Sequence, residues 1–128
     1  MDKMEHAKQL RDITEKHYNC AQSVLVPFAK EMGISEEQAY NIGAHFGAGM
    51  RHGSTCGALS GALMVLGAMG YGEQDAQAML RIFREKNGCT DCAHLLAQAK
   101  ERGEEKKPHC DRLVCECVQA VLDLTADK

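Results

Sequence analysis

Apolar residues recur every three or four positions along almost the whole chain, which is the spacing of one face of an α-helix. The first such face is formed by Met4, Ala7, Leu10, Ile13 and His17. No stretch of useful length alternates apolar and polar residues as a half-buried strand does. The pattern predicts an all-α fold, a compact bundle of six to seven helices. The chain has 128 residues and no evident linker or repeat, so we expect a single domain over residues 1–128.

Two capping boxes and one proline mark the helices that follow. Asn19 with Gln22, and Ser35 with Gln38, each place a glutamine three residues after a capping side chain. These pairs predict that helices begin directly after Asn19 and Ser35. Pro27 lies inside the first of these helices, where it removes a backbone hydrogen bond, so we expect a kink there.

The longest uncharged stretch runs from Gly53 to Gly72 and is rich in glycine. Its apolar content is too low for a membrane span, which takes about 20 apolar residues. We therefore expect a buried central helix from Cys56 to about Met69, in which Gly57 and Gly61 let neighbouring backbones pack closely. Three further helices are expected: about Gln74 to Lys86, a short helix from near Cys92, and about Cys110 to Leu124.

The charge of the chain argues against several classes of function. The formal net charge is −3, and residues of both signs are mixed along the sequence. Without a basic stripe, nucleic-acid binding is not expected. The N-terminal residues are charged and lack the apolar core of a signal peptide. We expect a cytoplasmic protein with no membrane attachment.

Seven cysteines are many for a chain of this length, and their odd number argues against a fully disulfide-paired scaffold. In a reducing cytosol they indicate metal binding, redox chemistry or burial. Three of them directly follow a capping-type residue, in Asn19-Cys20, Thr55-Cys56 and Asp91-Cys92. A thiol at a helix start meets free backbone N–H groups and the positive end of the helix dipole, which lower its pKa. The pattern favours reactive or metal-binding thiolates.

The same cysteines admit two other interpretations. Cys89-x2-Cys92 followed by Cys110-x4-Cys115 is close to the spacing of structural zinc sites, which would give a zinc-stabilised helical binding module. Helical geometry argues against this set, because residues five apart on a helix point about 140° away from each other. In the third interpretation the thiols simply fill space in a plain helical domain, often a homodimer through the glycine-faced helix.

A glycine-rich loop from Gly47 to Thr55 precedes the central helix. It lacks the lysine of a phosphate-binding loop. We expect its glycines to let the backbone approach a bulky neighbour, or a cluster, at the helix start. His45 and His52 flank the loop and could reach the region of Cys56.

Four segments of the chain resemble the C-GCAxxG-C-C family, small bacterial and archaeal proteins described as redox-active. These segments are NCAQSVL at 19–25, FGAGMRHGSTCGALSGALMVLGAMG at 46–70, CAHLL at 92–96, and Cys110 with Val114. Carried over onto this chain, the cysteines of the family fall on Cys20, Cys56, Cys92 and Cys110, and its last motif glycine on Gly61. One departure is the order Cys56-Gly57-Ala58, where the family name spells Gly-Cys-Ala.

The resemblance implies a redox centre in which these four cysteines act as catalytic or metal-binding residues, with Gly57 and Gly61 beside the cofactor. The related region of split-Soret cytochromes is associated with an iron–sulfur centre. Four thiolates here would therefore hold such a cluster for electron transfer with an unidentified redox partner protein, and the cluster would be lost in air. The other form is a dithiol–disulfide oxidoreductase with Cys56 as the attacking thiolate. Cys89, Cys115 and Cys117 fall outside the pattern and are expected to be dispensable.

Overall fold

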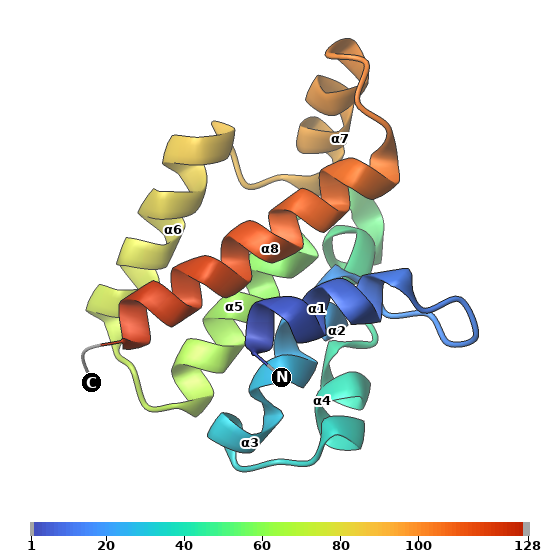
Figure 1. The fold of residues 1–128 in the computed structure, drawn as a ribbon. Coiled ribbons are helices and arrows are strands. Elements are labelled where there is room, and N and C mark those ends of the chain that lie inside the picture. The colour runs from blue at the N-terminus through green and yellow to red at the C-terminus, as the bar shows by residue number, and fades with distance from the viewer. Residues whose placement is uncertain (1, 127–128) are drawn as a thin grey trace.

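The structure is a computed structural model that describes residues 2–126. These residues form helices and no strand, which confirms the all-α class (Figure 1). The described part contains eight α-helices, so the predicted number of six to seven was too low. The helices are α1 (Lys3–Asp12), α2 (Cys20–Leu25), α3 (Ala29–Met32), α4 (Glu36–Gly43), α5 (Gly57–Ala68), α6 (Glu73–Asn87), α7 (Cys92–Glu101) and α8 (Lys106–Thr125).

The additional helix arises at Pro27. The second predicted helix is divided into α2, a short 3-10 turn labelled η1 (Val26–Phe28) and α3, and Pro27 lies in the first turn of η1. Proline has no N–H to continue the α-helical ladder, so the expected kink becomes a break between two helices. Gly33 then ends α3 with a φ of 76°, a left-handed conformation that glycine adopts without a steric penalty.

Helix α5 is the central element of the bundle and contacts α2, α6 and α8. Five of its apolar side chains are at most 1% exposed, namely Ala58, Leu59, Ala62, Val65 and Leu66. A Cβ atom on Gly61 would lie 3.0 Å from Ala21 O, so the glycine permits the close crossing of α2 over α5. The predicted buried central helix is thus confirmed. Within residues 2–126 no helix is both long and apolar enough to cross a bilayer.

Helix α8 is the longest element and packs against α1, α5 and α7 (Figure 1). Its core face consists of Leu113, Val114, Cys117, Val118 and Val121, each at most 2% exposed. The helix was predicted to begin near Cys110 but begins one turn earlier, at Lys106. Pro108 falls in this first turn, where a backbone N–H has no helical partner to lose, so the proline is tolerated.

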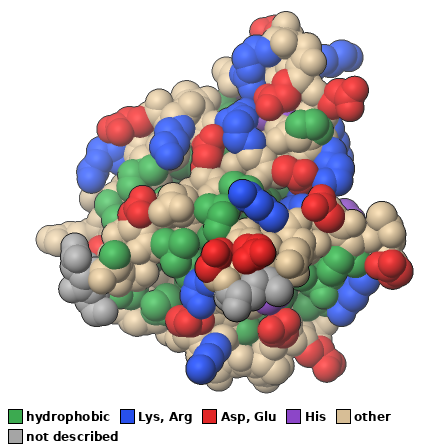
Figure 2. All heavy atoms as spheres, viewed as in Figure 1, with side chains coloured by type: hydrophobic (Ala, Val, Ile, Leu, Met, Phe, Trp, Pro, Cys, Tyr) green, Lys and Arg blue, Asp and Glu red, His purple; other side chains and the backbone are tan. Residues whose placement is uncertain are grey.

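The outer surface carries both signs of charge. On the face shown in Figure 2, Lys and Arg side chains are interspersed with Asp and Glu side chains. Several of them form ion pairs, including Lys3–Glu31 at 2.8 Å and Arg112–Glu116 at 2.9 Å. Exposed pairs of this kind contribute little to stability, about 1 kcal/mol or less each. This face has no extended patch of a single sign.

Candidate functional site

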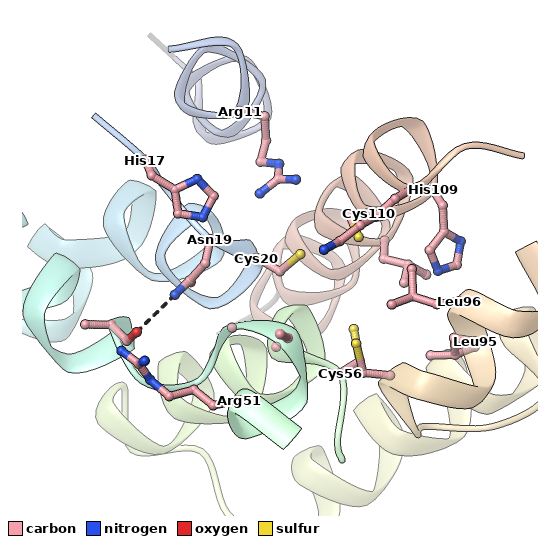
Figure 3. Close-up of a pocket in the computed structure, with 17 residues that line it drawn as sticks. Arg11, His17, Asn19, Cys20, Arg51, Cys56, Leu95, Leu96, His109 and Cys110 are labelled. Atoms are coloured by element: carbon pink, nitrogen blue, oxygen red, sulfur yellow. Dashed lines mark hydrogen bonds between the residues drawn. The ribbon is translucent and has the colours of Figure 1, made fainter. Parts of the chain in front are cut away.

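Four cysteines from four different segments line one cavity of about 290 Å³. The cavity lies where α2, α5 and α7 begin and where the second turn of α8 passes. Figure 3 shows Cys20, Cys56 and Cys110 directed toward this common space, and Cys92 is the fourth cysteine of its lining. The four cysteines singled out by the family pattern are therefore brought together, although they lie up to 90 positions apart in the sequence, from Cys20 to Cys110.

Cys20 is held by the capping box at the start of α2. The Asn19 side chain accepts a hydrogen bond from Gln22 N at 2.7 Å, and the Gln22 side chain accepts one from Asn19 N at 2.8 Å. Both halves of the predicted box are present, and Cys20 is the first residue of α2. Asn19 Nδ2 also donates to Gly43 O at 3.1 Å, which ties the end of α4 to the cavity wall.

Cys56 and Cys92 are positioned by one pair of backbone hydrogen bonds. Cys56 N donates to Thr90 O at 2.8 Å, and Cys92 N donates to Ser54 O at 2.6 Å. Between these bonds Thr55 and Asp91 form an isolated antiparallel β-bridge. The starts of α5 and α7 are thereby fixed side by side, which brings the two cysteines into the same wall.

The expected capping at these two helix starts is not found. Cys56 itself occupies the cap position of α5, because Thr55 is engaged in the bridge. Asp91 does precede α7, but its side chain accepts no capping hydrogen bond. Cys92 is nevertheless the first residue of its helix, as predicted.

The backbone beside Cys92 follows a left-handed path. Four consecutive residues between α4 and α5 have positive φ: Ala48 (52°), Gly49 (62°), Met50 (59°) and Arg51 (68°). Only one of them is glycine, and each L-residue in this conformation costs about 1–2 kcal/mol. A Cβ on Gly49 would lie 2.7 Å from Cys92 Cβ, so the loop passes directly under this cysteine. The backbone does approach closely, as predicted, but its neighbours are the Ser54 backbone and Cys92 rather than a bulky side chain.

Cys110 lies within α8, one turn after the helix begins, and is 8% exposed. Its chain neighbour His109 is 2% exposed and also lines the cavity. The Nδ1 atom of His109 lies 3.2 Å from Arg112 Nη2 and 3.5 Å from Glu104 Oε1. Burial is the largest cause that lowers the pKa of His109, and the Arg112 charge adds to it. His109 is therefore a neutral, fixed part of the wall at neutral pH.

Arg11 brings a positive charge to Cys20 and Cys110. Its Nε atom donates to Asp111 Oδ1 at 2.6 Å, and its Nη1 atom donates to Tyr18 O at 2.9 Å. These contacts hold the guanidinium group beside the two thiols, as Figure 3 shows for Cys20. No local pattern indicates this role, because Arg11 is one of several charged residues near the end of the first helix. Lys106, the second cation near Cys110, lies in a segment of mixed charges that has the pattern of an exposed connection.

The thiols of Cys20 and Cys110 line the same cavity, and the interaction between them separates their pKa values. The pKa of Cys110 falls to about 7, first because the neighbouring Cys20 thiol favours its charged form and then because Arg11 and Lys106 stabilise its charge; burial opposes this shift. The pKa of Cys20 rises well above its usual value of 9.0, because the neighbouring Cys110 sulfur, burial and the charge of Cys110 all favour the neutral thiol. Together the pair forms one thiolate and one thiol.

Cys56 and Cys92 behave differently from what their helix-start positions predict. Burial raises the pKa of Cys56 to about 11, although the backbone N–H groups of Leu59 and Ala58 favour its thiolate. Burial and the charge of Cys110 raise the pKa of Cys92. The stabilisation by the helix start is real at Cys56, but the desolvation of a charged sulfur outweighs it.

The remaining cysteines do not line the cavity. Cys117 is fully buried in the core, and burial raises its pKa far above the usual value. Cys115 lies near Lys8 and Arg11, outside the cavity lining. Residues 2–126 contain no group of three or more His, Cys, Asp or Glu side chains that could hold a metal ion. The zinc set predicted from Cys89, Cys92, Cys110 and Cys115 therefore gains no support from the geometry.

Only some of the glycines and histidines considered in the sequence analysis line the cavity. Gly57 lines the cavity, and a Cβ on it would lie 2.7 Å from Phe46 O. Gly61 lies one turn further along α5 and serves the packing against α2. Neither His45 nor His52, which flank the loop, lines the cavity, and His52 lines a separate surface hollow. The histidines that do line the cavity are His17, from the segment before α2, and His109.

The cavity agrees with what a comparison with known families finds. The family model described as "Putative redox-active protein (C_GCAxxG_C_C)" matches residues 18–124, which include all four cavity cysteines. No curated protein and no solved structure matches the chain. Since the match extends over most of the sequence, the chain belongs to the C_GCAxxG_C_C family of putative redox-active proteins.

Proposed function

We propose that this protein is a thiol–disulfide redox protein in which Cys110 and Cys20 are the reacting pair. The observation that carries the proposal is that the two thiols line one cavity together with Arg11 and Lys106. Cys20 is on α2 and Cys110 is on α8, so a disulfide between these residues would link two packed helices across the cavity. A thiolate is the nucleophile in disulfide exchange, and a neighbouring thiol completes the reaction.

The two thiols have distinct roles in this cycle. Cys110 is about half ionised at neutral pH, since its pKa is about 7, and attacks one sulfur of a disulfide substrate. The substrate releases one thiolate, which takes up a proton, and Cys110 is left in a mixed disulfide. Cys20 then loses its proton, attacks the Cys110 sulfur and releases the second substrate thiolate, which is protonated in turn. Two electrons pass to the substrate, and one Cys20–Cys110 disulfide is formed.

This assignment moves the attacking role from Cys56 to Cys110. With a pKa of about 11, Cys56 is a neutral thiol at neutral pH and a poor nucleophile. Cys56 and Cys92 line the same cavity and are proposed as a second pair, since backbone hydrogen bonds hold the starts of their helices side by side. In the proposal they act after the first pair, as partners for a disulfide that has formed at Cys110.

Disulfide mapping tests the proposal. The fully reduced protein is oxidised with a stoichiometric amount of a small disulfide, quenched in acid and digested for mass spectrometry. We expect a Cys20–Cys110 cross-link to appear first in the wild-type protein. Cys115→Ser is the control, because Cys115 lies outside the cavity, and it should form the same cross-link. Oxidation at Cys89 or Cys115 before Cys20 and Cys110 would contradict the proposal.

The convergence of four thiols supports a second candidate, a four-cysteine iron–sulfur cluster site. Four thiolates are the donor set that such clusters use, and Arg11 and Lys106 would compensate their charge. The cavity of about 290 Å³ leaves space between the four cysteines, although no three of them are placed to hold a single metal ion within residues 2–126. Cys20, Cys56, Cys92 and Cys110 would hold the cluster, which would supply one-electron transfer.

Protein purified without oxygen and without chelator distinguishes the two candidates. Its visible absorption and its iron, sulfide and zinc content per chain are measured together. Matched iron and sulfide, abolished by Cys56→Ser but not by Cys115→Ser, would establish the cluster and displace the disulfide cycle. Colourless protein without iron would leave the Cys110–Cys20 pair as the redox centre. Stoichiometric zinc would instead support the interpretation as a zinc-stabilised binding module.

A further inference from the structure

Apart from the Cys110 thiolate, the charged side chains that line the cavity all have one sign. Three cations line it, Arg11, Arg51 and Lys106, and no Asp or Glu is among the lining residues in the described part of the chain. The whole chain has a net charge of −3, and the face in Figure 2 shows both signs together. A cavity lined by three cations and no carboxylate in an acidic protein attracts anions, because the surrounding low-dielectric wall focuses the field.

Two of these cations are available to a ligand. Arg51 and Lys106 are exposed and form no salt bridge or side-chain hydrogen bond with any residue between positions 2 and 126. Both nevertheless line the cavity, so they stand where its interior meets solvent. The charge of Lys106 acts on Cys92 and on Cys110. Arg11, in contrast, is committed to Asp111.

The remaining wall suits a short carbon chain. Leu95, Leu96 and Leu113 line the same cavity and supply an apolar surface. The volume of about 290 Å³ is at the lower end of the range for small-molecule sites. Because Cys110 is only 8% exposed, a disulfide has to enter the cavity to reach its sulfur. A small molecule can do so more readily than a disulfide fixed on the surface of a folded protein.

We infer that the substrate of the cavity is a small anionic disulfide, whose carboxylate groups are drawn in by Arg51 and Lys106 while its sulfurs meet Cys110. This inference rests on the proposed thiol–disulfide function and adds the class of substrate. The balanced reaction converts one disulfide, RSSR, into two thiols, RSH, as Cys20 and Cys110 pass from two thiols to one disulfide. The protons of the two protein thiols end on the two product thiols.

Three disulfides of similar size and different charge test the inference. Dithiodipropionate carries two negative charges, bis(hydroxyethyl) disulfide carries none, and cystamine carries two positive charges. The rate with reduced protein is followed by quenched-flow mass spectrometry of the Cys20–Cys110 cross-link. Each rate is divided by the rate of the same disulfide with a small free thiol, which removes differences in intrinsic reactivity. We expect a normalised preference for the dianion over the dication of about tenfold or more, as charge focusing in a cleft gives.

Variants identify the groups responsible. Arg51→Gln and Lys106→Gln should each reduce the preference, and the double variant should remove it. Arg81→Gln is the matched control. It also removes one positive charge, but Arg81 is an exposed residue of α6 that does not line the cavity. A change in the reactivity of Cys110 itself, as Lys106→Gln could cause, scales all three rates equally and leaves their ratio unchanged. Added salt should weaken the preference in the wild type.

The two proposals fail in different ways. If all three normalised rates are equal, or if the Arg81→Gln variant loses as much preference as Arg51→Gln, the anionic substrate is excluded while the Cys20–Cys110 cycle stands. If no disulfide of any charge forms the Cys20–Cys110 cross-link, the redox pair itself is wrong and the inference falls with it.

Discussion

Arg11 of α1 donates through Nε to Asp111 of α8 at 2.6 Å, across one hundred positions of sequence. Asp111 lies directly after Cys110, so this pair attaches a fixed positive charge to the end of α1 that faces the thiol. Arg11 is thereby oriented by a carboxylate on one side and by Tyr18 O on the other. The reactive state of Cys110 thus depends on the packing of α1 against α8.

The first prediction concerns this charge. Arg11→Gln should raise the pKa of Cys110, because one of the cations that favour its thiolate is lost. A rise of one unit would leave roughly a tenth of the thiol ionised at neutral pH, against about half in the wild type. The rate of alkylation of Cys110 by iodoacetamide, followed by mass spectrometry, measures the change. Arg81→Gln removes a distant positive charge and should leave the rate as in the wild type; an equal loss there would refute the role of Arg11.

The second prediction follows from the opposite shifts at Cys110 and Cys56. Alkylation measured over the range from about pH 6 to about pH 11 should show Cys110 reacting first, with its midpoint near 7, and Cys56 last, with its midpoint near 11. A profile in which Cys56 reacts before Cys110 would return the attacking role to Cys56. The same experiment on the Cys20→Ala variant should move the Cys110 midpoint upward, because the interaction with the Cys20 thiol is the largest cause that lowers the pKa of Cys110.

The raised pKa of Cys56 also makes stability depend on pH. Because its pKa is higher in the folded state than the usual 9.0, the neutral thiol stabilises the fold fully below about pH 9, and this contribution is lost as the pH rises to about 11. The shift of about two units corresponds to roughly 3 kcal/mol. Urea unfolding with reductant present should therefore show a falling free energy of unfolding over this range. The free energy of unfolding of the Cys56→Ala variant should fall less steeply with pH. An unchanged slope would contradict the raised pKa of Cys56.

Local signals account for most of what was predictable. The capping box of Asn19 with Gln22 and the proline at position 27 act within a few residues, and both have the predicted structural effect. The pKa of Cys110 depends instead on Arg11 and Cys20, which are distant in sequence and become its neighbours only through helix packing. The prediction that Thr55 caps α5 was wrong for a similar reason. Its bridge to Asp91 is a long-range contact that no local sequence pattern indicates. Burial, which decides the pKa of Cys56, is likewise a property of the assembled fold.

The fourth prediction concerns the left-handed loop. Gly49→Ala would place a Cβ 2.5 Å from Ser54 O and 2.7 Å from Cys92 Cβ, in a residue whose φ is +62°. We expect a loss of stability of at least about 1–2 kcal/mol from the left-handed backbone alone. Thermal unfolding measures it, together with the alkylation rate of Cys92, which should change as the loop moves away. Gly67→Ala is the control, since a Cβ there meets nothing within 4 Å, and in the last turn of α5 it should not destabilise the protein.

The last prediction separates the stability of a helix start from its role at the cavity. Asn19→Ala and Ser35→Ala each remove one capping box, the first beside Cys20 and the second at the exposed start of α4. Each should lower the free energy of unfolding by about 1 kcal/mol, the usual effect of losing such a cap. Only Asn19→Ala should also slow formation of the Cys20–Cys110 disulfide, because Asn19 orients the first turn of α2 and anchors it to Gly43 O at 3.1 Å. If both variants slow the disulfide equally, the effect is one of global stability and Asn19 has no positioning role.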